Sequence, residues 1–250
     1  MTPGVITAAV GGICIGSFLT VVAHRIPRGA SVADGRSRCP SCAAPIAPRD
    51  NVPVLSWVLL RGRSRCCGEP ISVRYPLTEA LTALLFAATV AVYWGEPAEI
   101  ALGLILVATL VAVSLTDLER RVIPNRILAV AAVGAVAVTV LSDPGALPER
   151  LLAGFTAGGV LLAAALAYPR GMGMGDVKLA ATMGLFLGPE VAVALLGGLL
   201  AGSVAGLYLI ARHGSTARKR AIPFGPFLAL GGVVALLAGE PILDWYLGAF

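Results

Sequence analysis

The chain has 250 residues, of which 57% are hydrophobic and only 13% are charged. Its mean hydropathy of +0.86 is higher than a soluble domain of this length can bury, so the composition excludes a soluble globular protein and indicates an integral membrane protein. The formal net charge is +5. Membrane orientation and contact with anionic lipid explain this charge, so nucleic-acid binding is not expected.

Apolar segments alternate with polar connections along the whole chain. Most of them reach the roughly 17 to 25 residues that a membrane-spanning helix needs, but the segment near residues 177–188 is short. We therefore expect an all-α, polytopic helix bundle of about eight transmembrane segments with one cytoplasmic cysteine-containing loop. The expected segments lie near residues 3–24, 77–95, 97–117, 127–142, 151–168, 177–188, 190–211 and 223–239.

The basic residues predict the topology, because Lys and Arg beside spans stay on the cytoplasmic side. If residues 25–76 are cytoplasmic, all of the 19 basic residues except Arg150 fall on that side. Both termini then lie outside the cell membrane. Thr2 to His24 lacks a basic n-region and a clear cleavage site, so it is expected to be a retained helix of a multi-pass inner (plasma) membrane protein.

Composition divides the chain into three parts. Residues 1–24 form the first transmembrane helix, residues 25–76 the cytoplasmic cysteine loop, and residues 77–250 the membrane core. No internal repeat stands out, and no pattern indicates the oligomeric state.

Four of the five cysteines lie in the cytoplasmic loop. Cys39 and Cys42 form a C-x-x-C turn, and Cys66 and Cys67 follow about two dozen residues later. Two C-x-x-C turns would direct four thiolates at one tetrahedral zinc ion, but Ser64 stands where the second turn would begin. Two interpretations stay open: a zinc site at these four cysteines, or a cluster of reduced thiols in a compartment that disfavours disulfides.

Two aspartates are the candidate catalytic residues. Asp117 ends a long apolar run, and Asp176 follows the glycine-rich sequence from Gly171 to Gly175 and opens a short helix. A carboxylate at the margin of the hydrocarbon costs several kcal/mol unless it is compensated, so such a residue is by default a functional candidate. Ordinary roles stay open on the residues alone, Asp176 as a helix cap and Asp117 as an interfacial charge.

The helix ends predict unequal roles for the two acids. Asp176 begins a helix, where free N–H groups and the helix dipole favour a carboxylate, whereas Asp117 ends a helix and meets the opposite end of the dipole. We therefore expect Asp176 to carry the charge in the resting protein and Asp117 to hold the proton.

Short motifs accompany these residues in a fixed order along the chain. They are Gly16-Ser17-Phe18-Leu19, His24-Arg25-Ile26-Pro27, Cys39 to Cys42, Asp50 to Trp57, Pro70 to Pro76 with Glu79, Asp117 with Ile123-Pro124-Asn125, and Gly173-Met174-Gly175-Asp176-Val177-Lys178. Taken together, they resemble the type IV prepilin peptidase family, membrane aspartic proteases of the G-x-G-D class. The resemblance covers nearly the whole chain, and the combination is specific where G-x-G-D alone would be weak.

The resemblance implies peptide-bond hydrolysis by Asp117 and Asp176, which would share a proton and activate a water without a metal. Gly173, Gly175 and Lys178 match the active-site loop. Lys178 has two further interpretations, pairing with anionic membrane lipid or tuning Asp176. The implied substrates are prepilins or pseudopilins, whose basic leader is cut on the cytoplasmic side after a glycine and before a hydrophobic helix.

The resemblance also implies a second activity, because many family members N-methylate the new N-terminus with S-adenosylmethionine. That activity is associated with the loop between the first helices, and this chain keeps much of that loop. The sequence does not identify the residues that would bind S-adenosylmethionine.

Two other classes of function stay open. A transporter or proton-coupled channel would use intramembrane aspartates, but it predicts carboxylates near the bilayer midplane and inverted repeats, and neither is seen in the sequence. A membrane-tethered zinc or redox sensor would rest on the cysteines alone and leave the aspartates without a role.

Overall fold

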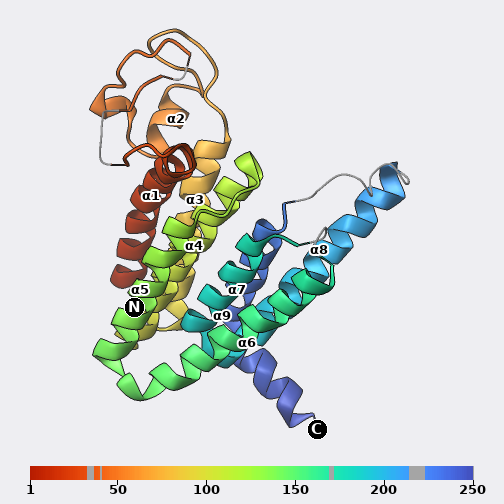
Figure 1. Ribbon diagram of the computed structural model, residues 1–250. Helices are drawn as coiled ribbons and strands as arrows, with labels where there is room; N and C mark the ends of the chain where they lie inside the picture. Colours follow the sequence, from red (N-terminus) through yellow and green to blue (C-terminus); the bar gives the residue numbers. More distant parts are fainter. Residues whose placement is uncertain (33–36, 40, 169–171, 214–222, 250) are drawn as a thin grey trace. The chain divides into compact units, whose positions relative to one another are not determined.

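The computed structural model describes residues 1–32, 37–39, 41–168, 172–213 and 223–249 (Figure 1). Within these residues the chain is helical, with two isolated β-bridges and no strand. This confirms the expected all-α class. The chain forms two compact units, Met1–Ala91 and Val92–Phe250, and each is described by itself below.

The first unit consists of long helices that flank a polar loop. Its elements are α1 (Thr2–Arg25), η1 (Ile26–Arg28), η2 (Pro48–Asp50), α2 (Leu55–Leu59) and α3 (Arg74–Val92). Glycines of α1 lie directly against the backbone of α3. A Cβ at Gly12 would lie 2.7 Å from Ala83 Cα, and one at Gly16 would lie 2.8 Å from Glu79 Cα. Small residues of this kind allow two helix backbones to approach closely in lipid.

The second unit is a bundle around a mostly apolar core. Its elements are α4 (Pro97–Arg120), α5 (Asn125–Ser142), η3 (Pro144–Ala146), α6 (Leu147–Ala167), α7 (Met174–Leu187), η4 (Gly188–Glu190), α8 (Val191–His213) and α9 (Gly225–Gly248). α6 packs along α7, α8 packs along α9, and α4 packs against α5 and α9 (Figure 1). Side chains such as Leu106, Leu179 and Leu228 are completely buried between these helices.

Seven stretches of the described chain are long and apolar enough to cross a membrane. The sequence predicted about eight, and the difference lies in Met174–His213, where α7, η4 and α8 count as one stretch of 40 residues. α7 has only 14 residues, which corresponds to about 21 Å, less than the roughly 30 Å of a hydrocarbon core. It is the short segment expected near residues 177–188, a separate helix surrounded by longer neighbours.

Arg150 joins three helices at one end of the second unit. Its guanidinium pairs with Glu99 of α4 at 2.5 Å and also donates to the carbonyl of Phe186 in the last turn of α7. A cation is favourable there because the last carbonyls of a helix lack partners within it. A cavity of about 210 Å³ beside Arg150 is lined by the acidic residues Glu96, Glu99, Glu190 and Glu240, so four acidic side chains gather at one end of this unit.

Close contact between α8 and α9 leads to a stability prediction. A Cβ at Gly231 would lie 2.0 Å from the carbonyl oxygen of Ala194, whereas a Cβ at Gly206 would meet nothing within 4 Å. We expect Gly231→Ala to destabilise the protein by about 1–3 kcal/mol or more, because α9 must move away from α8. The midpoint of thermal unfolding in detergent measures this effect.

Gly206→Ala is the matched control in the same helix pair, and we expect it to leave the midpoint unchanged or to raise it slightly, because alanine is the better helix former. Equal midpoints for the two variants would show that the α8–α9 contact does not limit stability.

Candidate active site

Asp117 and Asp176 lie where the last turn of α4 meets the first turns of α7 and α9. Both side chains are buried, with 6% and 8% of their surface exposed. α4 and α7 are in contact with each other and with α9, whose first residue, Gly225, binds the Asp117 carboxylate. The structure therefore brings together two residues that are far apart in the sequence. Two carboxylates in such a site do not both ionise at low cost and so titrate as a pair.

The position of Asp117 is set by α9 as well as by its own helix. Arg121, the residue that follows α4, has a left-handed conformation (φ 55°), and its N–H donates to the backbone carbonyl of Asp117. The side-chain Oδ2 of Asp117 accepts a hydrogen bond of 2.8 Å from the N–H of Gly225. A Cβ at Gly225 would lie 2.9 Å from that oxygen. Only glycine therefore lets α9 begin directly at the carboxylate.

Gly225 is a residue that the sequence analysis missed. Its signal was present, because Gly225-Pro226 opens an apolar run and proline is favoured in the first turn of a helix. What the sequence did not indicate is that this helix starts at Asp117. We expected Asp176 to be ionised and Asp117 to be protonated because Asp176 begins a helix and Asp117 ends one. In the structure each carboxylate accepts a backbone N–H at the start of a helix, so the helix ends do not distinguish Asp117 from Asp176.

Asp176 is held by the glycine-rich turn that precedes it. The N–H of Gly173 donates to Asp176 Oδ2 at 3.1 Å, and the N–H of Asp176 donates to the carbonyl of Gly173 at 3.1 Å. A Cβ at Gly175 would lie 3.0 Å from Ile123 Cβ, so this glycine makes room for the connection between α4 and α5. Asp176 is therefore the third residue of α7, and its carboxylate binds the N–H of Gly173, the residue before the helix. Gly171 lies outside the described residues.

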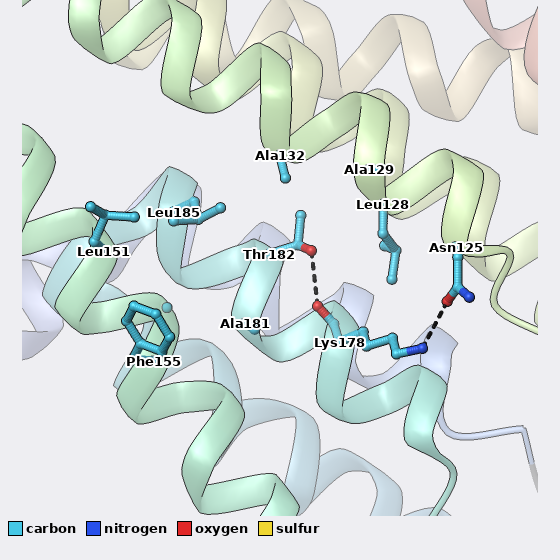
Figure 2. A pocket seen from close by; sticks show the side chains of 11 residues that line it. Asn125, Leu128, Ala129, Ala132, Leu151, Phe155, Lys178, Ala181, Thr182 and Leu185 are labelled. Atoms are coloured by element: carbon cyan, nitrogen blue, oxygen red, sulfur yellow. Dashed lines mark hydrogen bonds between the residues drawn. The ribbon is translucent and has the colours of Figure 1, made fainter.

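Lys178 lies one turn into α7 and reaches the start of α5. Its Nζ donates to Asn125 Oδ1 at 3.1 Å (Figure 2). The side chain is exposed, and an ammonium has three N–H donors, so one bond to Asn125 leaves others for a further partner. Lys178 thus connects α5 with α7 beside Asp176.

Glu79 belongs to the first unit and anchors the loop to α3. The carboxylate is buried, and its Oε2 accepts a hydrogen bond of 2.6 Å from the N–H of Val54. Val54 has φ 59° and ψ −54° immediately before α2, a conformation that is rare for a β-branched residue. The hydrogen bond that Glu79 accepts from Val54 holds this turn in place.

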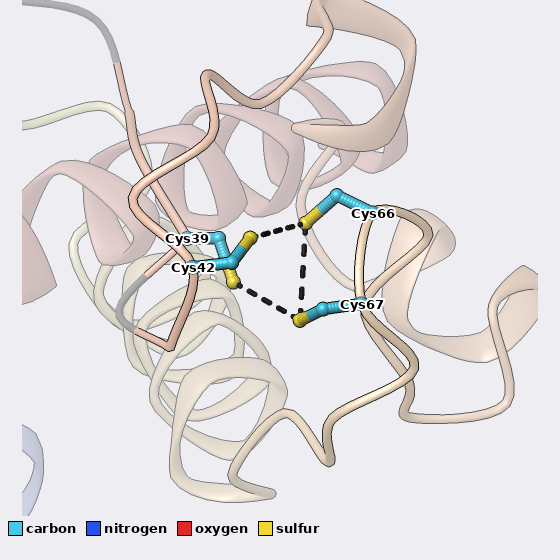
Figure 3. Close-up of side chains that lie close together, drawn as sticks. All are labelled: Cys39, Cys42, Cys66 and Cys67. Carbon is cyan, nitrogen blue, oxygen red and sulfur yellow. Dashed lines mark hydrogen bonds between the residues drawn. The ribbon is translucent and has the colours of Figure 1, made fainter.

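The four loop cysteines gather in one cluster (Figure 3). The Sγ atoms of Cys39, Cys42, Cys66 and Cys67 all lie within 4.8 Å of one another. The Sγ–Sγ distance is 3.2 Å between Cys42 and Cys66, 3.7 Å between Cys39 and Cys67, and 4.0 Å between Cys66 and Cys67. Tetrahedral zinc with Zn–S bonds of about 2.3 Å requires sulfurs about 3.8 Å apart. The set of four thiols therefore fits a zinc ion in both chemistry and spacing.

The cluster is built from two equivalent turns, residues 38–45 and 63–70. Each turn is closed by an antiparallel bridge between its first and last residues. In each, the N–H of the second residue donates to the carbonyl of the seventh, at 2.9 and 2.8 Å. Both turns carry the pattern Arg-x-x-x-Cys-x-x-Pro. The expectation that the chain has no internal repeat is wrong here, because one short repeat of eight residues gives too weak a sequence signal.

The repeat explains how the cluster forms although Ser64 replaces the first cysteine of a second C-x-x-C turn. Ser64 occupies the place in the second turn that Cys39 occupies in the first, and Cys67 corresponds to Cys42. The Ser64 hydroxyl lies 3.0 Å from Cys66 Sγ and 3.6 Å from Cys39 Sγ. The thiol of Cys66 therefore completes the group of four beside the serine.

Hydrogen bonds favour the thiolate form of Cys39. Bonds from the backbone N–H of Cys42, the Ser64 hydroxyl and the backbone N–H of Ser41 lower the pKa of Cys39 to about 6. Cys39 is also the buried member of the cluster, with 4% of its surface exposed. A thiolate at this position is the form that a metal ion binds.

Comparison with known proteins places the chain in a family. Residues 10–93 match the family described as Bacterial Peptidase A24 N-terminal domain, and residues 104–210 match the Type IV leader peptidase family. No solved structure matches the chain.

Three characterised relatives are similar over most of their length. The prepilin leader peptidase/N-methyltransferase of Aeromonas hydrophila is 36% identical over 95% of this chain and 92% of its own. The protein of the same name from Bacillus subtilis (strain 168) is 34% identical over 94% and 95%. A type 4 prepilin-like proteins leader peptide-processing enzyme of Escherichia coli O78:H11 is 37% identical over 92% and 93%. The chain therefore belongs to the type IV leader peptidase family.

Proposed function

We propose that this chain is a membrane aspartic endopeptidase that removes the basic leader of type IV prepilins or pseudopilins. The observation that carries the proposal is the meeting of two buried aspartates at the ends of α4 and α7, in a chain whose relatives are named prepilin leader peptidases. The transporter alternative receives no support from these relatives. It also requires carboxylates at the bilayer midplane, whereas both aspartates lie at helix ends.

In the proposed mechanism, Asp117 and Asp176 bind a water between them and share one proton. The ionised carboxylate takes a proton from the water, and the protonated one polarises the carbonyl of the scissile peptide bond. The N–H groups of Gly225 and Gly173 both bond to an Oδ2 atom. We assign the two Oδ1 atoms to the water and the substrate. The chemistry of proteolysis requires no metal.

The active site is proposed to face the cytoplasm of a multi-pass inner-membrane protein whose termini are outside. Basic residues support this orientation, because Arg120, Arg121, Arg126 and Lys178 lie near the aspartate end of the second unit and the acidic cavity around Arg150 lies at the other ends of the same helices. A substrate leader with basic residues would remain on the same side of the membrane.

We further propose that the cysteine cluster binds one zinc ion and that the chain N-methylates the new N-terminus. Cys39, Cys42, Cys66 and Cys67 would hold the metal, and the ion would order a loop that has little apolar core of its own. The names of the relatives support the methyltransferase activity, with S-adenosylmethionine as its cofactor in this family. Mass spectrometry of the cleaved product, with and without S-adenosylmethionine, tests whether its N-terminal amine gains a methyl group.

The aspartate pair is tested by Asp117→Asn and Asp176→Asn. We expect each variant to lose at least about 100-fold in the rate of prepilin cleavage, because an amide cannot share the proton that activates the water. Cleavage of a purified prepilin in detergent, followed by gel electrophoresis, measures the rate.

Asp244→Asn is the control, because Asp244 is an exposed carboxylate at the far end of α9. It should cleave at the wild-type rate. Substantial cleavage by either site variant, when the variant is folded and monodisperse, would contradict the mechanism.

The zinc site is tested by comparing Cys66→Ser with Ser64→Ala. We expect about one zinc per wild-type chain, a strong loss in Cys66→Ser, and retention in Ser64→Ala, because the structure gives the fourth sulfur to Cys66. Elemental analysis of reduced, purified protein measures the content. Cys14→Ser controls for the effect of removing a thiol elsewhere.

Removal of zinc by a chelator should leave prepilin cleavage largely intact. A zinc content near zero in the wild-type protein would leave a reduced thiol cluster, and equal content in Cys66→Ser and the wild type would contradict the ligand assignment.

A further inference from the structure

An apolar groove of about 460 Å³ runs along one side of α7 (Figure 2). α7 forms its floor, and α5 and α6 form its walls. The lining is apolar over most of its length, with Leu128 and Ala132 from α5, Gly154 and Phe155 from α6, and Ala181 and Leu185 from α7. The hydroxyl of Thr182, which also lines the groove, donates to the carbonyl of Lys178.

The polar end of the groove lies beside the candidate active site. Asn125 and Lys178 line this end, and Lys178 is two residues beyond Asp176 on the same helix. From there the groove extends past Leu185, a distance of about 10 Å along α7. Neither aspartate lines the groove, and Asp176 and Lys178 project from different faces of α7. Because Asp176 is in the first turn of α7, a peptide whose scissile bond lies at the aspartates reaches the groove by passing around that turn.

The arrangement of α5 and α6 opens the groove to the side of the bundle. The two helices are joined by the short η3, and both pack against α7. In Figure 1 they diverge from η3 toward the aspartate end of the unit. Each is apolar and long enough to cross a membrane. The lining of the opening between them is apolar, so it suits an apolar, membrane-embedded group.

We propose that this groove binds the apolar helix of the substrate that directly follows the scissile bond. The inference rests on the proposed peptidase function and names the part of the protein that holds the substrate in the membrane. The polar end of the groove and Asp176 lie at the same end of α7, and this position favours a substrate helix over a bound lipid, since a lipid gains nothing from lying near the aspartates.

The lining also fits a helix. Ala129, Ala132, Gly154 and Ala181 place small side chains along the floor and walls, and helices in lipid associate where small residues let their backbones approach. Near the scissile bond the substrate must be extended, so its backbone groups lose their helical partners. The remaining donors of Lys178 and the amide of Asn125 can bind them there.

The test narrows the groove with Ala132→Phe and uses Val133→Phe as the matched control. Val133 is the next residue of α5, is 70% exposed and does not line the groove. The substrates are a full-length prepilin that the wild-type protein cleaves and a short peptide that spans its cleavage site but lacks the apolar segment.

For Ala132→Phe we expect KM for the full-length prepilin to rise about tenfold with little change in kcat. The ratio of kcat/KM for the prepilin to that for the peptide should fall by a similar factor. Val133→Phe should leave the ratio at the wild-type value. An unchanged ratio in a folded Ala132→Phe protein would overturn the proposal. Failure of the wild-type protein to cleave any prepilin would instead overturn the proposed function.

Photo-crosslinking gives a second measurement that does not depend on turnover. A photoreactive phenylalanine at position 132, in the Asp176→Asn background, should crosslink to the apolar segment of the prepilin, and the same group at position 133 should not. Crosslinks to phospholipid alone from position 132, with an unchanged KM for the prepilin, would show that the groove is a lipid site and would overturn the proposal.

Discussion

A hydrogen bond from the first N–H groups of a helix to a buried carboxylate is the interaction on which the site depends. It occurs twice, from Gly225 to Asp117 and from Gly173 to Asp176. A carboxylate beside hydrocarbon needs such compensation, and the positive end of a helix dipole supplies it without a cation. The Gly225 bond joins the end of α4 to the start of α9, whereas the Gly173 bond closes the turn that opens α7. The helices and the acids therefore fix each other's positions.

The same constraint explains why glycine occurs at these places. Gly225 and Gly175 lie where a side chain would strike Asp117 or Ile123. Each therefore allows two chain segments to meet at a distance that no other residue permits. The short α7 fits this arrangement, because its first turn holds Asp176 while its length leaves room for a groove between α5 and α6.

The cysteine loop obtains its order in a different way. Many of its large apolar side chains stay exposed, and its fixed points are polar. Glu79 binds Val54, Asp50 forms a two-pronged ion pair with Arg65, and the Trp57 indole N–H donates to a backbone carbonyl. The bond with Arg65 lowers the pKa of Asp50. Four converging thiols add a site that a metal ion can close, so a small loop can be rigid without a hydrophobic core.

The sequence alone determined the membrane class, the helical segments, the two aspartates and the cysteines, because apolar length and local motifs are properties of neighbouring residues. The sequence also shows that Ser64 stands where a second C-x-x-C turn would have a cysteine. Only the folded turns show that Cys66 supplies the fourth thiol instead. Tertiary structure alone decided that α9 begins at Asp117, that both acids cap helices, and that α5 and α6 leave a groove beside Lys178. These features join residues tens of positions apart, and no local pattern records which helix ends meet.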